Sequence, residues 1–159
     1  MILIDNLKKV CGTDEVETMI EENKKNESLK GRGEMILAIE DEESLRDYLQ
    51  TILEENGHKV LLASDGKEGL QIYMEHVHEI SLVLLDMGLP GIGGAEVLAK
   101  LVTINPKVKV ISVSGYIEPE VQSGALENGA VDFLPKPYLM GDLLTKVHRT
   151  LQRTEETTR

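Results

Sequence analysis

The sequence has a single cysteine, Cys11, among its 159 residues, so no disulfide can form within the chain. Its unbroken apolar runs are only a few residues long, far short of the roughly 20 residues that a membrane-spanning helix needs. The first lysines follow the N-terminal apolar stretch, the reverse of the order in a secretory signal peptide. We therefore expect neither a disulfide-rich secreted scaffold nor a membrane protein, and we expect a cytoplasmic location.

Positive charge is also scarce. Seventeen Lys and Arg stand against 28 Asp and Glu, which gives a formal net charge of −11. Because a chain this acidic repels the phosphate backbone of nucleic acids, we expect no nucleic acid partner. The same charge favours cationic ligands, metal ions included.

The chain divides by composition into an extension and one domain. Residues 1–34 are polar, with apolar residues at helical spacing only near 14–25, and residues 23–33 have the composition of a linker. We assign residues 35–152 to a single domain and residues 153–159 to a polar tail, too short to fold as an output domain.

From residue 35 onward, short apolar runs alternate with segments of helical periodicity. The runs are continuously apolar, as in strands that are buried on both faces, which predicts an α/β fold with a parallel sheet between two layers of helices. The expected strands are 35–39, 60–63, 80–85, 108–113 and 131–134, and the expected helices lie near 45–53, 70–77, 98–102, 118–128 and 143–151.

Polar side chains follow several of these expected strands. Glu40 and Asp41 follow the first strand, Asp86 the third, Ser114 the fourth and Lys136 the fifth. Ligands of open parallel sheets bind beyond the carboxyl ends of the strands, so these groups should converge in one crevice. Three converging carboxylates repel one another unless a cation lies between them, and all-oxygen ligation favours Mg²⁺.

The same set is suited to phosphoryl transfer. The carboxylate of Asp86 is ionised near neutral pH and can attack phosphorus without a general base. A metal ion, the Lys136 ammonium and the Ser114 hydroxyl would stabilise the charge that develops. The pattern thus predicts an aspartyl phosphate.

At this point the chain resembles the receiver domains of two-component response regulators, either single-domain or from a hybrid histidine kinase. The resemblance rests on the acidic pair and three motifs in the same order: Leu84–Gly91 around Asp86, Ser114-Gly115-Tyr116, and Phe133–Pro137. It implies a flavodoxin-like doubly wound (βα)5 fold with strand order 2-1-3-4-5. It also implies phosphorylation of Asp86 by a sensor histidine kinase or a histidine phosphotransfer protein.

Further roles follow from the resemblance alone. Asp41, Asp86 and the backbone carbonyl of Gly88 would hold Mg²⁺ directly, with Glu40 acting mostly through water. Ser114 would hydrogen-bond the phosphoryl group and Lys136 would pair with it.

The resemblance also implies a switch and an output surface. Lys136–Pro137 would be a cis peptide, and Phe133 would turn inward as Ser114 moves toward the phosphate. The signal would leave through the fourth helix, fifth strand and fifth helix of the domain, to a protein partner.

Three positions depart from the commonest receiver pattern. Glu40 replaces aspartate and Ser114 replaces threonine, but each keeps its functional group. Gly88 offers no side chain where relatives tune hydrolysis of the acyl phosphate, and the resemblance implies that Tyr116 would lie near the phosphoryl group, so the lifetime of the phosphate is open in either direction.

Two other functions stay open at this stage. A degenerate receiver would act only as a protein-interaction module and would never be phosphorylated. A small-molecule phosphatase of the haloacid dehalogenase type would need a second aspartate at the position of Gly88. The four histidines, 58, 76, 78 and 148, show no common partner, and we expect them at the solvated surface.

Overall fold

The computed structural model describes residues 5, 8–9, 12–115 and 119–153, which fall into two compact units, Met1–Lys30 and Gly31–Arg159. In the first unit, helix α2 spans Thr13–Ser28 and is longer than the segment expected near 14–25. It continues through residues 23–28, part of the stretch with linker composition, because Glu, Lys and Asn are all tolerated in an exposed helix. Tyr116, Glu118 and most of the tail lie outside the described residues.

The described part of the second unit holds a parallel sheet of five strands in the order β2-β1-β3-β4-β5, and the predicted fold is confirmed. The order places β1 and β3 at the centre, with β3 beside β4. The strands are β1 (Met35–Ile39), β2 (Lys59–Ala63), β3 (Ile80–Asp86), β4 (Val110–Ser114) and β5 (Asp132–Pro135).

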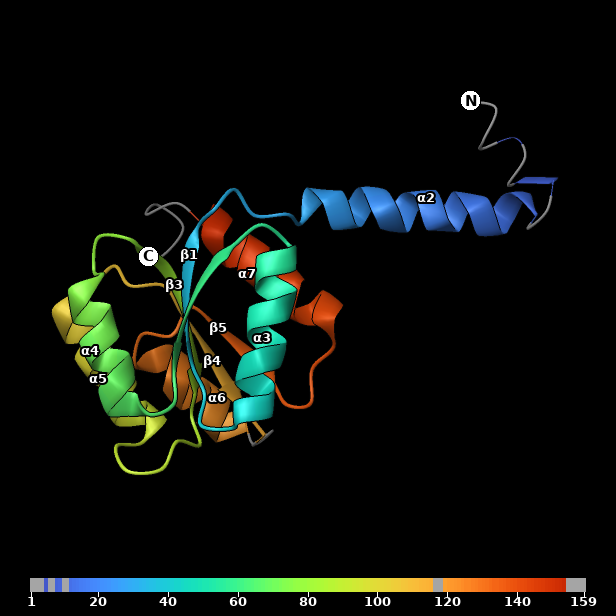
Figure 1. Cartoon of the computed structure of the whole chain (residues 1–159). Coiled ribbons are helices and arrows are strands. Elements are labelled where there is room, and N and C mark those ends of the chain that lie inside the picture. The colour runs from blue at the N-terminus through green and yellow to red at the C-terminus, as the bar shows by residue number, and fades with distance from the viewer. Residues whose placement is uncertain (1–4, 6–7, 10–11, 116–118, 154–159) are drawn as a thin grey trace. The chain divides into compact units, whose positions relative to one another are not determined.

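Helices cover both faces of this sheet (Figure 1). The helices α3 (Glu43–Glu55) and α7 (Met140–Gln152) lie on one face, and α4 (Gly66–Glu75) and α5 (Gly94–Ile104) lie on the other. Helix α6 (Pro119–Glu127) contributes Ala125 to the apolar cluster that α4 and α5 share. Val77, assigned to the second helix by its spacing, lies beyond the end of α4, because the backbone N–H of His76 already caps the helix.

The central strands are buried on both faces. Leu37 and Ile39 of β1 belong to the cluster under α4 and α5, and the alternating residues Ile36 and Ala38 are also buried. A strand in this setting favours apolar side chains over most of its length. Polar groups therefore follow the strands, at the carboxyl edge of the sheet.

The segment before β1 packs onto the loop between α3 and β2. The N–H of Gly31 donates to the Asn56 carbonyl at 2.6 Å, and the N–H of Gly33 donates to the Gly57 carbonyl at 2.8 Å. A Cβ on Gly31 would lie 2.4 Å from the ring of His58, so a larger residue there would have to displace that ring.

The surface position expected for His58 is therefore wrong. Its side chain is 2% exposed, and its Nδ1 lies 3.2 Å from Oε2 of Glu34 without hydrogen-bond geometry. Burial lowers the pKa of His58, although the charge of Glu34 opposes the shift. The fold therefore favours the neutral imidazole.

Within the described residues, no helix is both long enough and apolar enough to cross a membrane. The cytoplasmic location expected from the sequence stays a prediction.

Candidate functional site

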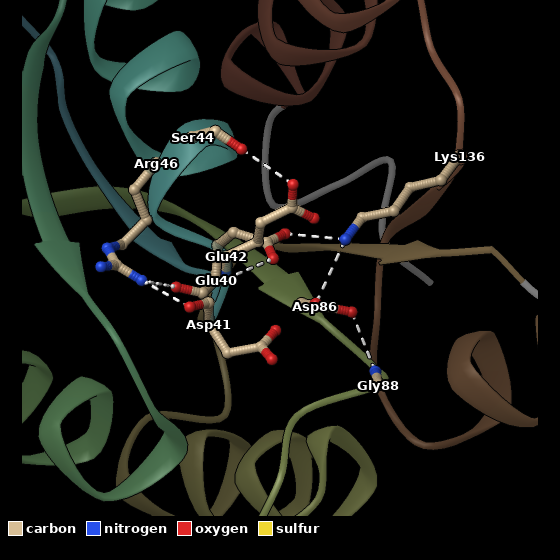
Figure 2. Close-up of polar contacts among 8 residues, drawn as sticks. All are labelled: Glu40, Asp41, Glu42, Ser44, Arg46, Asp86, Gly88 and Lys136. Carbon is tan, nitrogen blue, oxygen red and sulfur yellow. Dashed lines mark hydrogen bonds and ion pairs between the residues drawn. The ribbon is translucent and has the colours of Figure 1, made fainter.

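Three carboxylates meet at the carboxyl edge of the central strands (Figure 2). Glu40 and Asp41 directly follow β1, and Asp86 ends β3, its neighbour in the sheet. One oxygen from each of the three carboxylates lies within 4.8 Å of the others. Glu40 and Asp86 are 3% and 6% exposed, whereas Asp41 is open to solvent. The structure thus brings together the three acidic residues that the sequence singled out.

Lys136 reaches this cluster from the end of β5. Its Nζ lies 2.8 Å from Oε2 of Glu40 and 3.2 Å from Oδ2 of Asp86. Burial alone would lower the pKa of Lys136, but the hydrogen bond to Glu40 and the two nearby negative charges outweigh it and raise the pKa. The ammonium is therefore held in its charged form between two carboxylates.

For Glu40, in contrast to Lys136, the effect of burial on the pKa outweighs the effect of the hydrogen-bond partners. Burial raises its pKa, and the charge of Asp86 adds to the effect, while Lys136 and the N–H of Glu42 act against it. Such a carboxylate is costly to keep ionised in this site. A cation in the cluster would lower that cost.

Backbone groups fix the orientation of the carboxylates. The N–H of Gly88 donates to Oδ1 of Asp86 at 2.8 Å, and the N–H of Glu42 donates to Oε1 of Glu40 at 3.1 Å. The N–H of Met87 donates to the Val113 carbonyl at 2.9 Å and ties the loop to β4. Asp86 is thus held by an amide on one oxygen and by Lys136 on the other.

Arg46 is a supporting residue that the sequence analysis missed. Its Nη1 donates to the backbone carbonyls of Glu40 and Asp41, each at 2.8 Å (Figure 2). It lies on α3, one turn into the helix that follows the acidic pair, and fixes the backbone of that pair. The only signal in the sequence was a lone cation in an acidic segment, which is more often a solvated side chain.

Gly94 is a second supporting residue without a distinctive signal. A Cβ there would lie 2.5 Å from Cα of Met87 and 2.6 Å from the Asp86 carbonyl. Helix α5 therefore begins in direct contact with the backbone of Asp86. Nothing in the run Gly91–Gly94 distinguishes this glycine from its neighbours.

The remaining predicted residues lie on β4 and β5. Ser114 is buried at the end of β4, next to β3, and its carbonyl accepts from the N–H of Lys136 at 2.8 Å. Phe133 is buried on β5, paired with Ser112. The bond between Lys136 and Pro137 is cis. Tyr116, near the same edge in sequence, lies outside the described residues.

The donor set fits a hard divalent cation. In the part of the chain that the structure describes, these three carboxylates are the only cluster of His, Cys, Asp or Glu close enough to share an ion. Carboxylate oxygens are the ligands that Mg²⁺ prefers, and the absence of sulfur and imidazole from the set disfavours zinc. The residues present are therefore compatible with Mg²⁺.

Comparison with known protein families gives a match to the response regulator receiver domain over residues 36–148. Among curated proteins, the transcriptional regulatory protein YkoG of Bacillus subtilis is 36% identical over 118 residues, 74% of this chain and 51% of YkoG. The sensor kinase CckA of Brucella abortus is 32% identical over 76% of this chain and 13% of CckA. The chain thus spans about half the length, or less, of these relatives.

Solved structures give the same result. A response regulator receiver domain protein from Clostridium thermocellum has a TM-score of 0.73 and 31% identity, over 77% of this chain and 98% of its own. A CheY-like receiver domain protein from Methanospirillum hungatei has a TM-score of 0.70 and 31% identity, over 79% of this chain and 98% of its own.

Proposed function

The chain belongs to the response regulator receiver domain family, and from this premise we propose that it accepts a phosphoryl group on Asp86. The donor is a phosphohistidine of a sensor histidine kinase or of a histidine phosphotransfer protein. The product is an aspartyl phosphate that changes a protein-interaction surface. One observation carries the proposal: Asp86 is buried and oriented, with Lys136 on one oxygen and an amide on the other.

In the proposed step, a carboxylate oxygen of Asp86 attacks phosphorus and the phosphorus–nitrogen bond of the phosphohistidine breaks. The electron pair of that bond stays with the imidazole of the donor. Lys136, already within 3.2 Å of Asp86, would exchange that contact for the phosphoryl oxygens. The hydroxyl of Ser114, at the end of the adjacent strand, would donate to the same group.

Mg²⁺ would be held by Asp41, Asp86 and the backbone carbonyl of Gly88, with Glu40 acting mostly through water. When bound, the ion neutralises negative charge on the carboxylates and on the transferred phosphoryl group. Glu40 keeps Lys136 in place by accepting at 2.8 Å. Arg46 keeps the acidic pair in place through the backbone carbonyls.

The proposed output surface consists of α6, β5 and α7. Exposed apolar side chains at Leu126, Leu139 and Met140 support it, since they leave apolar area open to a partner. Phe133 and Ser114, on neighbouring strands, would connect this surface to the site by moving together after phosphorylation.

The proposal is tested by the intact mass of the protein after incubation with acetyl phosphate and Mg²⁺. We expect one added phosphoryl group in the wild type and none in Asp86→Asn or in the presence of EDTA. Because some receivers refuse small donors, a sample without adduct is titrated with beryllofluoride and its melting temperature is measured. No adduct and no beryllofluoride-dependent stabilisation would contradict the proposal and favour a purely structural interaction module.

A further inference from the structure

An apolar groove lies between α4 and α5, and its lining residues belong neither to the phosphoacceptor site nor to the proposed output surface. Its volume is about 660 Å³. Helices α4 and α5 pack against each other along one face of the sheet (Figure 1). The lining of the groove includes Lys67, Leu70 and Met74 of α4, Lys100 and Ile104 of α5, and Ile92 from the loop after β3.

The groove leaves apolar side chains in contact with solvent. Met74 is 56% exposed and Ile104 is 39% exposed, although both lie on helices whose other faces are buried in the core. Lys67, Leu70 and Met74 follow one another at spacings of three and four, so they form one continuous stripe along α4. A stripe of this kind matches the side-chain spacing of a helix laid along it.

The charge of the groove lining is opposite in sign to the net charge of the chain. The chain carries a net charge of −11, yet the described residues that line the groove include Lys67 and Lys100 and no carboxylate. Lys100 pairs with Glu96 at 2.9 Å, but both side chains are about half exposed, and such pairs contribute little and exchange readily. An occupant with negative charges beside an apolar face is complementary to this lining.

The walls of the groove are fixed before any partner arrives. A Cβ on Gly66 would lie 2.5 Å from Val97 and 2.9 Å from Ile92, so the start of α4 packs closely against α5 and its loop. The start of α5 is held in the same way by Gly94 against Met87. A preformed groove spares the binding free energy that ordering it would otherwise cost.

From these observations we propose that the groove between α4 and α5 binds an amphipathic helix of a partner protein, with an apolar stripe flanked by Asp or Glu. The apolar stripe of the partner helix contacts Leu70, Met74 and Ile104 of the groove. The acidic residues on either side of that stripe face Lys67 and Lys100. The proposal is independent of phosphoryl transfer at Asp86.

The test uses the full chain and two labelled helical peptides of about 18 residues, or five turns, with the same leucine stripe. One peptide has Glu flanks and the other has Lys flanks. Fluorescence anisotropy measures the affinity for each. We expect the Glu peptide to bind at least about tenfold more tightly, and charge reversal at Lys67 and Lys100 together to invert the order. The net charge of the whole chain predicts the opposite preference, so equal binding or tighter binding of the Lys peptide would overturn the proposal.

A matched pair of variants locates the binding surface. Met74→Glu and Leu126→Glu each place a carboxylate at an exposed apolar position, the first in the groove and the second on α6. We expect Met74→Glu alone to weaken the Glu peptide by about tenfold or more. Equal losses in both variants would place binding elsewhere and refute the proposal. Sedimentation measures whether the wild-type chain forms a dimer. A dimer that dissociates in the Met74→Glu variant would assign the groove to a second copy of the chain instead.

Discussion

Replacing Asp86 by Asn should stabilise the protein when no divalent cation is present. In the wild type, oxygens of Glu40, Asp41 and Asp86 lie within 4.8 Å of one another. Asparagine keeps the shape of the side chain and can still accept from the N–H of Gly88 through Oδ1, now 2.8 Å away. The substitution removes the charge and replaces Oδ2, which accepts from Lys136 at 3.2 Å, by an amide nitrogen that cannot accept. Lys136 keeps its contact with Glu40 at 2.8 Å.

The distances give the expected magnitude. At an effective dielectric constant of about 20, two unit charges 4.8 Å apart repel by about 3.5 kcal/mol, so the two neighbouring carboxylates oppose the charge of Asp86 by about 7 kcal/mol. The attraction to Lys136 at 3.2 Å returns about 5 kcal/mol. The difference of about 2 kcal/mol is an upper bound because Asp41 is exposed and solvent screens its share, so we expect a net gain between zero and about 2 kcal/mol.

The assay is urea denaturation at pH 7.5 in EDTA, with Asp47→Asn on the exposed side of α3 as the matched control. We expect the control to change the free energy of unfolding by less than about 0.5 kcal/mol. Addition of Mg²⁺ should stabilise the wild type more than Asp86→Asn and so narrow the difference between them. A loss of stability in Asp86→Asn in EDTA would refute the reasoning, because it would show that the attraction of Asp86 to Lys136 exceeds its repulsion by Glu40 and Asp41.

Three further predictions concern the metal site, the buried histidine and the start of α5. Mg²⁺ at about 100 times its dissociation constant should raise the free energy of unfolding by about 2.7 kcal/mol in thermal melts, and a melt unchanged by Mg²⁺ or EDTA would contradict the metal site. Burial lowers the pKa of His58, so the unfolded chain binds a proton on this residue at a higher pH than the folded chain does. The free energy of unfolding should therefore be highest above about pH 6.5 and fall as the pH drops toward the folded-state pKa of His58. His58→Leu should remove that fall in urea titrations at pH 5 and 7.5, and an unchanged pH dependence would count against it. Gly94→Ala should destabilise by roughly 1–3 kcal/mol and slow phosphorylation of Asp86, whereas Gly141→Ala on α7, with nothing within 4 Å of the new Cβ, should do neither.

The fold was predictable because the apolar runs and the segments of helical periodicity point to the same architecture. Continuously apolar runs separated by helical periodicity require a parallel sheet, and the strands of such a sheet end at one edge. That geometry alone brings Glu40, Asp41, Asp86 and Lys136 together, as the structure confirms. The strand order itself came from the resemblance to receiver domains, since periodicity does not specify which strands are neighbours.

The features that the sequence did not reveal depend on contacts between distant residues. His58 is buried because the backbone of Gly31 passes over its ring, 27 positions earlier in the chain, and no local pattern records that approach. Arg46 acts through backbone carbonyls, which are present at every residue and leave no trace in the sequence. Met74 fits the apolar periodicity of its helix but faces solvent, because periodicity identifies a stripe without identifying what covers its edges.

The most direct test of the central claim is to identify the modified residue chemically. Borohydride reduces an aspartyl phosphate to homoserine, so tandem mass spectrometry of the phosphorylated and reduced protein reports the acceptor position by position. We predict homoserine at position 86 only in samples that received both a phosphoryl donor and Mg²⁺. Homoserine at position 41 instead, or a phosphorylated protein with an intact aspartate at position 86, would contradict the account.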